Sequence, residues 1–583
     1  MDLRFLNAEP TDTEREAVDA LGTGSARDQL LPALHAVNDR VGWISQGALN
    51  HICRRLNVPP AEAYGVASFY ALFSLKERPP RVVHVCTDLA CRVNGAEAVC
   101  DALTETAGAA GFTWHRSPCL GVCERAPAAL AFEAGDPAEE RLLAPATPEE
   151  IARGTFDREE APISVPQQGE PGLRLLRRVG VVDPESLDAY RAAGGYAALR
   201  NALVLGSAGV IREVTDSGLM GRGGAAFPTG RKWDATARQP ERTRYLVCNA
   251  DESEPGTFKD RVLIEGDPFA LVEAMTIAAF AIGAQKGYVY LRGEYPRALR
   301  LLRNAIDVAR ERGFLGENIM GRHGFSFDIE IRRGAGAYIC GEETAIFNSI
   351  EGFRGEPRTK PPFPVEKGLF GKPTVVNNVE TLVNVPLILT EGCEAYRRIG
   401  TERSAGPKLF CLSGNVRRPG VYEVPFGATL GELLELAGGV PEGRELRAVL
   451  LGGAAGGFVR PDELGLPLTM EDARAAGTTL GSGVVLALDD RADLGGFLLR
   501  IAAFFRDESC GQCVPCRIGT VRQEEALHRI VGGRKLSTGG DDLALLREVG
   551  QVMRDSSICG LGQTAWNAIE SAIDRLGALE ERT

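Results

Sequence analysis

Four cysteines near the C-terminal end have the residue type and spacing of a redox cofactor site. Cys510, Cys513 and Cys516 are separated by two residues each, and Cys559 lies further along the chain. A triplet plus one remote thiolate is typical of a loop wrapped around a 4Fe–4S cluster, because each thiolate must reach a different corner. A four-cysteine zinc site is the alternative, although structural zinc usually takes its cysteines as two separated pairs. The chain is therefore predicted to move electrons.

A second set of four cysteines lies in the N-terminal part of the chain. Cys86 and Cys91 form one pair, and Cys119 and Cys123 form the other. The first pair follows the β-like run Arg81–Cys86, so two loops at one end of a sheet can present both pairs together. Four thiolates on two loops suit a 2Fe–2S cluster, with zinc as the alternative. The other six cysteines are interpreted as small core residues: Cys53, Cys100, Cys248, Cys340, Cys393 and Cys411.

A glycine-rich loop spans residues 218–230. Its glycines let a ligand approach the backbone closely and expose N–H groups to phosphate. The pattern Gly221-x-Gly223-x-x-Ala226 formally matches a dinucleotide-binding fingerprint. That motif requires a preceding strand, whereas residues 198–214 have a helical pattern. We therefore infer contact with a phosphate or a flavin, without assigning a nicotinamide-binding motif.

Three polar runs lie beside predicted strands or helix starts. Residues 249–261 follow a β-like segment, residues 334–344 open a helix, and Asn377 and Asn378 follow a Pro/Gly loop. Loops at the carboxyl ends of strands bind ligands in open α/β sheets, although residues 249–261 also suit an exposed acidic loop. Glu342 and Glu343 are adjacent carboxylates, which either perturb each other's pKa in a cleft or cap a helix.

Composition excludes several function classes. The chain has 583 residues, 44% hydrophobic content and a formal net charge of −12. That charge argues against nucleic acid as a partner. The N-terminus has no apolar signal core, so the fourteen cysteines are interpreted as ligands or buried thiols rather than disulfides. The apolar run 269–284 contains Glu273 and is too short to span a bilayer, so no direct membrane insertion and a cytoplasmic location are expected.

Taken together and in this order, these motifs resemble the flavoprotein subunit of the NADH dehydrogenase module of respiratory complex I, over residues 190–580. The N-terminal 150 residues resemble its thioredoxin-like two-iron partner subunit, here joined to it in one chain. The resemblance implies a multidomain α/β and α+β chain that holds FMN, NAD(H), one 4Fe–4S and one 2Fe–2S cluster. The implied domains are a helical bundle (1–75), a thioredoxin-like 2Fe–2S domain (76–160), a linker (161–175), a Rossmann-like FMN domain (176–402), a β-grasp domain (403–490) and a helical 4Fe–4S domain (491–583).

The resemblance also assigns residues to the two nucleotides. Those implied to line the FMN are Gly221, Gly223, Gly224, Asn249, Asp251, Asn377 and Asn378. Those implied to lie near the nicotinamide dinucleotide are Phe227, Lys232, Glu254, Tyr338, Glu342, Glu343 and Phe363. An aromatic face can stack on adenine, and a carboxylate can accept hydrogen bonds from ribose hydroxyls and disfavour NADP.

The implied reaction is hydride transfer between nicotinamide C4 and flavin N5, followed by single-electron transfer through the 4Fe–4S cluster. The cofactor carries this chemistry and needs no proton-transferring side chain. The 2Fe–2S cluster is expected on the other side of the flavin, as a reservoir or second exit.

The fusion of the two modules and the retention of all four N-terminal cysteines favour one type of complex. They favour the β (diaphorase) subunit of a soluble formate dehydrogenase, with a large molybdopterin α-subunit as partner. The alternatives are the diaphorase subunit of an NAD-reducing nickel–iron hydrogenase and a fused complex I subunit. A hypothesis of a different class is an electron-wire scaffold that lacks FMN.

Overall fold

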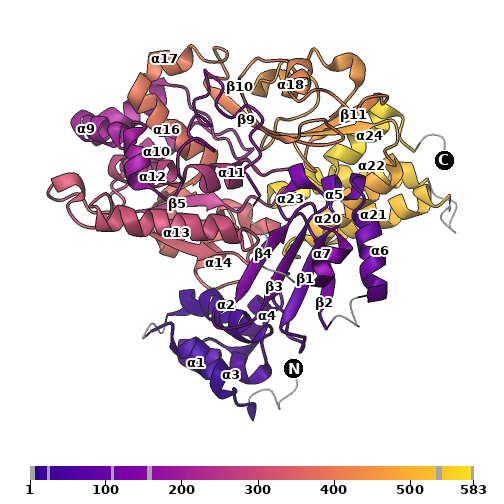
Figure 1. Cartoon of the computed structure of the whole chain (residues 1–583), viewed down its shortest axis with the longest axis horizontal. Helices are drawn as coiled ribbons and strands as arrows, with labels where there is room; N and C mark the ends of the chain where they lie inside the picture. Colours follow the sequence, from indigo (N-terminus) through magenta and orange to yellow (C-terminus); the bar gives the residue numbers. More distant parts are fainter. Residues whose placement is uncertain (1–6, 23–25, 107–110, 154–160, 534–540, 580–583) are drawn as a thin grey trace.

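The protein is described from a computed structural model that covers residues 7–22, 26–106, 111–153, 161–533 and 541–579 (Figure 1). Four short helices come first, α1 (Asp12–Asp19), α2 (Leu30–Val41), α3 (Gln46–Leu56) and α4 (Pro60–Ala67). Thr11 caps α1 through a capping box, and the Ser45 side chain accepts a hydrogen bond from the Ala48 N–H at the start of α3. Such caps satisfy the free N–H groups of the first turn. The predicted helical start of the chain is confirmed.

The next domain is built on a four-stranded sheet with the order β2-β1-β3-β4. Strand β1 (Arg81–Cys86) runs parallel to β2 (Thr113–Ser117) and antiparallel to β3 (Ala129–Glu133), which pairs with β4 (Glu139–Leu143). Helices α5 (Leu89–Val93), α6 (Ala96–Thr106) and α7 (Pro148–Arg153) complete it. Because β1 and β2 are adjacent and parallel, the loops that follow them leave the same edge of the sheet.

The third region carries a fully parallel sheet with the order β7-β6-β5-β8. Its strands are β5 (Tyr245–Ala250), β6 (Lys286–Leu291), β7 (Asp328–Arg333) and β8 (Thr374–Asn378). Its helices are α8 (Leu187–Ala192), α9 (Ala197–Asp216), α10 (Thr229–Ala237), α11 (Lys259–Gly266), α12 (Pro268–Ile282), α13 (Pro296–Glu311), α14 (Glu343–Ile350), α15 (Pro364–Lys367), α16 (Val379–Glu391) and α17 (Cys393–Arg397). Helices on both faces of a parallel sheet are the arrangement that the alternating pattern predicted.

Helix α12 contains the longest apolar run and is almost entirely buried. Its one acidic residue, Glu273, accepts hydrogen bonds from the Tyr190 hydroxyl and from the N–H groups of Tyr196 and Leu199. A buried carboxylate is tolerated when several donors satisfy it. The run is therefore a core helix, as predicted. Within the residues that the structure covers, no helix has the length and apolarity needed to cross a membrane.

A mixed five-stranded sheet with the order β10-β9-β13-β11-β12 follows. Its strands are β9 (Pro407–Gly414), β10 (Gly420–Pro425), β11 (Leu446–Leu451), β12 (Gly457–Val459) and β13 (Val484–Asp489), with helices α18 (Leu430–Leu436) and α19 (Met470–Ala475). The chain ends in helices α20 (Leu494–Asp507), α21 (Val514–Val531), α22 (Asp542–Ser556), α23 (Gly560–Thr564) and α24 (Asn567–Leu576).

The segment between the second and third domains packs against the five-stranded sheet. The Glu423 carboxylate on β10 accepts hydrogen bonds from the N–H groups of Arg174, Leu175 and Leu176. The Val421 N–H donates to the Ser164 carbonyl. This connection is therefore held in place by backbone hydrogen bonds over residues 164–176.

Candidate functional site

A cavity of about 490 Å³ lies beyond the carboxyl ends of β5 and β8. Loops of the five-stranded sheet and the start of α23 complete its wall, so three regions of the chain contribute to it. A parallel sheet binds ligands at this edge. The structure brings eight of the predicted nucleotide-binding residues together here: Gly223, Gly224, Asn249, Asp251, Glu254, Tyr338, Glu342 and Asn378.

The glycine-rich loop forms a tight hairpin at the mouth of this cavity. The Gly221 N–H donates to the Phe227 carbonyl at 2.9 Å, and Gly224 has φ +110°, which side chains rarely adopt. A Cβ atom on Gly223 would lie 3.1 Å from the Cβ of Asn378. Below the loop, the buried Arg222 guanidinium donates to the Ala405 carbonyl at 2.8 Å. The loop is therefore held so that its backbone faces the cavity.

The polar groups of the cavity include one that lacks a protein partner. The Asp251 Oδ2 oxygen is buried and, among the described residues, accepts no hydrogen bond. Burial raises the pKa of this carboxyl well above its usual range. Asn249 Nδ2 donates to the Gly341 carbonyl at 2.8 Å, and Asn378 Oδ1 accepts from the Glu380 N–H at 3.0 Å. A glycine cradle beside an unsatisfied oxygen fits a flavin that supplies the missing donor.

Glu254 and Tyr338 are bound to each other in the same cavity. The Tyr338 hydroxyl and the Ala455 N–H both donate to the Glu254 carboxylate. Burial raises the pKa of Glu254 to about 7. The Tyr338 N–H donates to Glu508 at 2.8 Å on the other side, where burial likewise raises the pKa of Glu508 to about 7. Tyr338 is thus fixed between two carboxyl groups.

The remaining predicted nucleotide-binding residues do not line this cavity: Gly221, Phe227, Lys232, Glu343, Phe363 and Asn377. The Phe227 and Phe363 side chains are each 53% exposed. Lys232 Nζ donates to the Val376 carbonyl at 3.0 Å, and Asn377 Oδ1 accepts from Trp233 Nε1 at 2.8 Å. Asn377 therefore holds helix α10 against β8.

The adjacent carboxylates Glu342 and Glu343 have different surroundings. Glu342 caps α14, since it accepts from the N–H groups of Thr344 and Ala345. Glu343 lies 3.5 Å from Lys232 Nζ. Lys360 Nζ is 2.9 Å from Glu342 and 3.2 Å from Glu343. Sequence reasoning missed Lys360, because nothing in its local Pro-rich segment indicates that it reaches this pair.

The C-terminal cysteines meet around a small cavity. Cys510, Cys513, Cys516 and Cys559 all line it. Cys513 and Cys559 directly precede α21 and α23, and Cys516 lies in the first turn of α21. Ile339 and Leu561 line both this cavity and the larger one. The four cysteines therefore lie around one cavity, which adjoins the larger cavity through shared side chains, and their role as cluster ligands stays a prediction.

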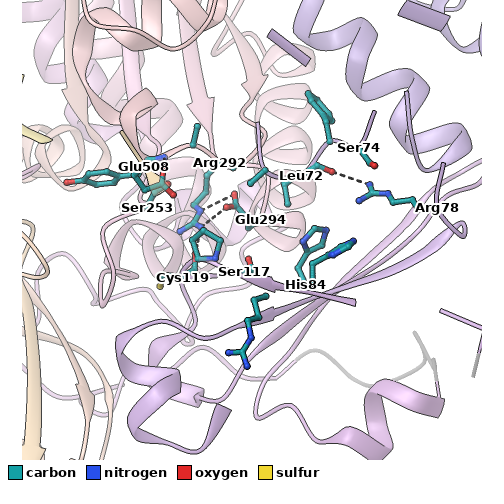
Figure 2. Close-up of a pocket in the computed structure, with 18 residues that line it drawn as sticks. Leu72, Ser74, Arg78, His84, Ser117, Cys119, Ser253, Arg292, Glu294 and Glu508 are labelled. Atoms are coloured by element: carbon teal, nitrogen blue, oxygen red, sulfur yellow. Dashed lines mark hydrogen bonds and ion pairs between the residues drawn. The ribbon is translucent and has the colours of Figure 1, made fainter. Parts of the chain in front are cut away.

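The N-terminal cysteines are buried at the edge of the first sheet. Cys119 Sγ lies 3.3 Å from Cys123 Sγ, and the Cys119 N–H donates to Asp88 at 3.2 Å. Arg500 of α20 holds Asp88 from the other side at 3.3 Å. Cys119 also lines a second cavity of about 250 Å³, which shares Ser253 and Tyr338 with the larger one (Figure 2). The larger cavity therefore adjoins both the cavity lined by Cys119 and the cavity lined by the C-terminal cysteines.

The cavity also contains residues that sequence reasoning did not single out. Some lie within the runs that it marked: Ala225, Glu252, Ser253, Thr257, Asp260, Ile339 and Gly341. The rest come from parts of the chain that it did not assign to the site: Gly452, Ala455, Thr479, Gly481 and Ser482 of the five-stranded domain, and Gly560, Leu561, Thr564 and Asn567 of the C-terminal helices.

Comparison with protein families gives four matches along the chain. They are a thioredoxin-like [2Fe-2S] ferredoxin (residues 16–145), the Nuo51 FMN-binding domain (214–387), an SLBB domain (409–459) and the NADH-ubiquinone oxidoreductase-F iron–sulfur binding region (496–579). These matches confirm the predicted multidomain fold and its cofactors, FMN, a 2Fe–2S cluster and a 4Fe–4S cluster. The zinc alternatives are not retained.

Comparison with individual proteins gives similar redox proteins. The F subunit of NADH-quinone oxidoreductase from Aquifex aeolicus is 47% identical over 69% of this chain and 92% of its own length. The alpha subunit of the NAD-reducing hydrogenase HoxS of Cupriavidus necator is 37% identical over 94% of this chain and 91% of its own. A crystal structure of an air-oxidized NAD⁺-reducing [NiFe]-hydrogenase superposes with a TM-score of 0.81 and 33% identity, covering 96% of this chain and 94% of that one.

Proposed function

Since the chain belongs to the family of FMN- and iron–sulfur-containing NADH-oxidising subunits of complex I and of NAD-reducing hydrogenases, we propose that it is a diaphorase subunit. It exchanges hydride between NAD(H) and FMN and passes single electrons through its clusters. The observation that supports this most directly is the larger cavity, which shares wall residues with both cysteine-lined cavities. Bound FMN would supply the exchange between two-electron and one-electron transfer.

We propose that the glycine loop and the ends of β5 and β8 hold the FMN. Gly223 and Gly224 present their backbone to the cavity, where a phosphate is favourable. Gly221 holds the loop in shape, because its N–H donates to the Phe227 carbonyl. Asn249, Asp251 and Asn378 offer amide and carboxyl groups to the ring system or ribityl chain. Asn377 holds this edge of the sheet against α10, because its Oδ1 accepts a hydrogen bond from Trp233 Nε1.

The dinucleotide binds, in this proposal, at the exposed rim. Phe227 and Phe363 have large exposed ring surfaces for stacking on the bases. The Glu254 carboxylate, which the Tyr338 hydroxyl holds in position, accepts hydrogen bonds from ribose hydroxyls. Lys232 and Lys360 lie beside Glu342 and Glu343, so this charged group orients the pyrophosphate and nicotinamide side of the ligand.

We propose that Cys510, Cys513, Cys516 and Cys559 bind the 4Fe–4S cluster and that Cys86, Cys91, Cys119 and Cys123 bind the 2Fe–2S cluster. Val514 and Ile558 are exposed apolar residues that directly follow Cys513 and directly precede Cys559 in the chain. Exposed apolar side chains beside a redox site fit docking of the partner that exchanges electrons.

For the partner, we propose a large redox subunit that carries further iron–sulfur clusters. A formate-oxidising molybdopterin α-subunit is supported by the retention of all four N-terminal cysteines in a fused chain. A nickel–iron hydrogenase is the second candidate, supported by similarity to a hydrogenase alpha subunit over 94% of this chain. The cytoplasm is the proposed location, because cluster assembly needs reduced thiols.

Two measurements test the proposal. The purified chain should contain FMN and reduce ferricyanide with NADH. A preparation with both clusters but neither FMN nor that activity would instead support the electron-wire scaffold. Mass spectrometry of proteins that co-purify under anoxic conditions then decides the complex. A molybdopterin subunit supports formate dehydrogenase, whereas nickel–iron subunits support hydrogenase and overturn our preferred partner.

A further inference from the structure

One buried arginine joins the backbone of the flavin cavity to the backbone of a 2Fe–2S ligand. Arg292, just after β6, is only 2% exposed. One terminal nitrogen of its guanidinium donates to the Glu252 carbonyl, and the other donates to the Cys119 carbonyl at 2.6 Å. Glu252 lines the larger cavity, and Cys119 lines the second one. The Arg292 side chain therefore contacts the walls of both cavities.

Glu294 holds this guanidinium in place. Its carboxylate accepts from Arg292 Nη2 at 2.8 Å and from Nε at 3.2 Å, and it is only 6% exposed. Figure 2 shows the pair on one wall of the cavity that Cys119 also lines. Charges in such a buried place act through a lower effective dielectric than surface charges and are screened less by salt.

The other charged residues of this cavity are Arg78, Arg116 and Glu508. Arg78 donates to the carbonyls of Gly42 and Leu72. Arg116 is paired with Glu97 near the surface. Glu508 accepts from the Tyr338 N–H. In contrast to these three, the Arg292 side chain is bonded directly to the backbone of a cluster ligand.

We propose that Arg292 and Glu294 are positioning residues of the 2Fe–2S cluster and that they shift its reduction potential in opposite directions. Reduction adds one negative charge to the cluster, so a nearby guanidinium favours it and a nearby carboxylate disfavours it. Cluster potentials are known to depend on local charge and hydrogen bonding. This inference rests on the proposed assignment of the four N-terminal cysteines as ligands.

The test is a redox titration of the full-length, cofactor-loaded protein, followed by the EPR signal of the reduced 2Fe–2S cluster. Arg292→Met should lower the one-electron reduction equilibrium constant at least tenfold, which corresponds to a fall of about 59 mV for a one-electron couple. Glu294→Gln should raise the potential by a shift of similar size. Arg292→Lys keeps the charge and should stay close to the unmodified protein.

A purely structural role predicts a different pattern. Loss of packing would shift the cluster potentials of Arg292→Met and Glu294→Gln in the same direction or leave both unchanged. Either result would overturn the proposal. Arg244→Met is the matched control, because that guanidinium also donates to backbone carbonyls of the same domain, those of Gln239, Glu241 and Ile282. The reduction potential of the 2Fe–2S cluster should be the same in this variant as in the unmodified protein.

Where Arg292→Met does not retain the cluster, Glu294→Gln decides alone, and a fall or no change in its potential overturns the proposal. If the unmodified protein gives no 2Fe–2S signal, the ligand assignment itself is wrong. The failure of the inference and the failure of the proposed function are therefore distinguishable.

Discussion

Glu254→Gln is the substitution that most directly tests the proposed dinucleotide site. Glutamine keeps the size of the side chain and one acceptor oxygen but removes the negative charge. The Glu254 carboxylate already accepts from the Tyr338 hydroxyl and the Ala455 N–H. A carboxylate has further acceptor sites, which in the proposal are used by ribose hydroxyls.

The expected loss follows from the strength of charged and neutral hydrogen bonds. A bond to a charged group contributes about 1.5–3 kcal/mol and a neutral one about 0.5–1.5 kcal/mol. The difference is about 1–1.5 kcal/mol per bond, which corresponds to about five- to tenfold weaker NADH binding at about 1.4 kcal/mol per tenfold. The KM for NADH should rise by this factor while the FMN content stays unchanged, since the predicted FMN contacts come from other residues.

The same substitution should remove a pH dependence. Burial raises the pKa of Glu254 from 4.5 to about 7, so the carboxyl group is largely neutral below that pH and ionised above it. The ionised form is the better acceptor, and the KM for NADH should therefore fall as the pH rises from about 6 to about 8.

The contribution of Glu254 to the stability of the fold decreases as the pH rises. A carboxyl whose pKa is raised by folding stabilises the fold below pH 4.5, and that contribution is lost as the pH rises through about 7.

The assay is NADH–ferricyanide kinetics across this pH range, with FMN quantified by fluorescence after release. Glu508→Gln is the matched control. Burial raises the pKa of Glu508 to about 7 as well, and it is also bonded to Tyr338, but it lines the cavity that contains Cys119. The KM of the Glu508→Gln variant for NADH should equal that of the unmodified protein. An unchanged KM in Glu254→Gln, or an unchanged pH slope, would refute the assignment.

Three further predictions concern the clusters, the stability and the glycine loop. Cys513→Ala should abolish the 4Fe–4S EPR signal and electron delivery to the partner, while part of the NADH–ferricyanide activity survives; complete loss of FMN would contradict this. Lys408→Met removes one of two buried ammonium partners of Glu380, which keeps Lys259, and should destabilise the protein by about 1.5–3 kcal/mol. An unchanged thermal unfolding midpoint would show that this estimate is wrong. Gly224→Ala forces a side chain into φ +110° and should lower the FMN content without affecting either cluster signal; full FMN occupancy would argue against a cradle there.

The sequence predicts those parts of the site whose signal is local. The spacing of Cys510, Cys513 and Cys516 requires only that one loop precedes a helix, and α21 begins there. The β-like run before Cys86 becomes β1, and its neighbour β2 is parallel. The acidic run after residue 249 follows β5 directly. In each case a few consecutive residues determine both the backbone and the side chains that it presents.

The sequence does not predict contacts that depend on the packing of distant segments. Lys360 reaches Glu342 from a loop that has no sequence signature of its own. Ile339 and Leu561, which form the wall between the larger cavity and the C-terminal cysteines, are ordinary apolar residues separated by most of two domains. Their role depends on how α23 docks beside the loop that precedes α14, which no periodicity encodes.

The docking of the N-terminal domain shows what the covalent fusion contributes. Arg261 of α11 is 1% exposed and donates to the Gly121 carbonyl at 2.9 Å, and it pairs with Glu124 at 2.6 Å. A Cβ atom on Gly121 would lie 2.1 Å from the Tyr295 hydroxyl oxygen, so the cysteine loop lies directly against the flavin domain. Moving the loop away would remove Glu124 as a partner of Arg261, which keeps Glu265 of its own helix at 3.1 Å. The loss of that charged hydrogen bond would cost about 1.5–3 kcal/mol. The covalent connection raises the local concentration of the two domains, whereas these contacts fix their orientation. The geometry on which electron transfer depends is therefore determined by the interface and not by the linker.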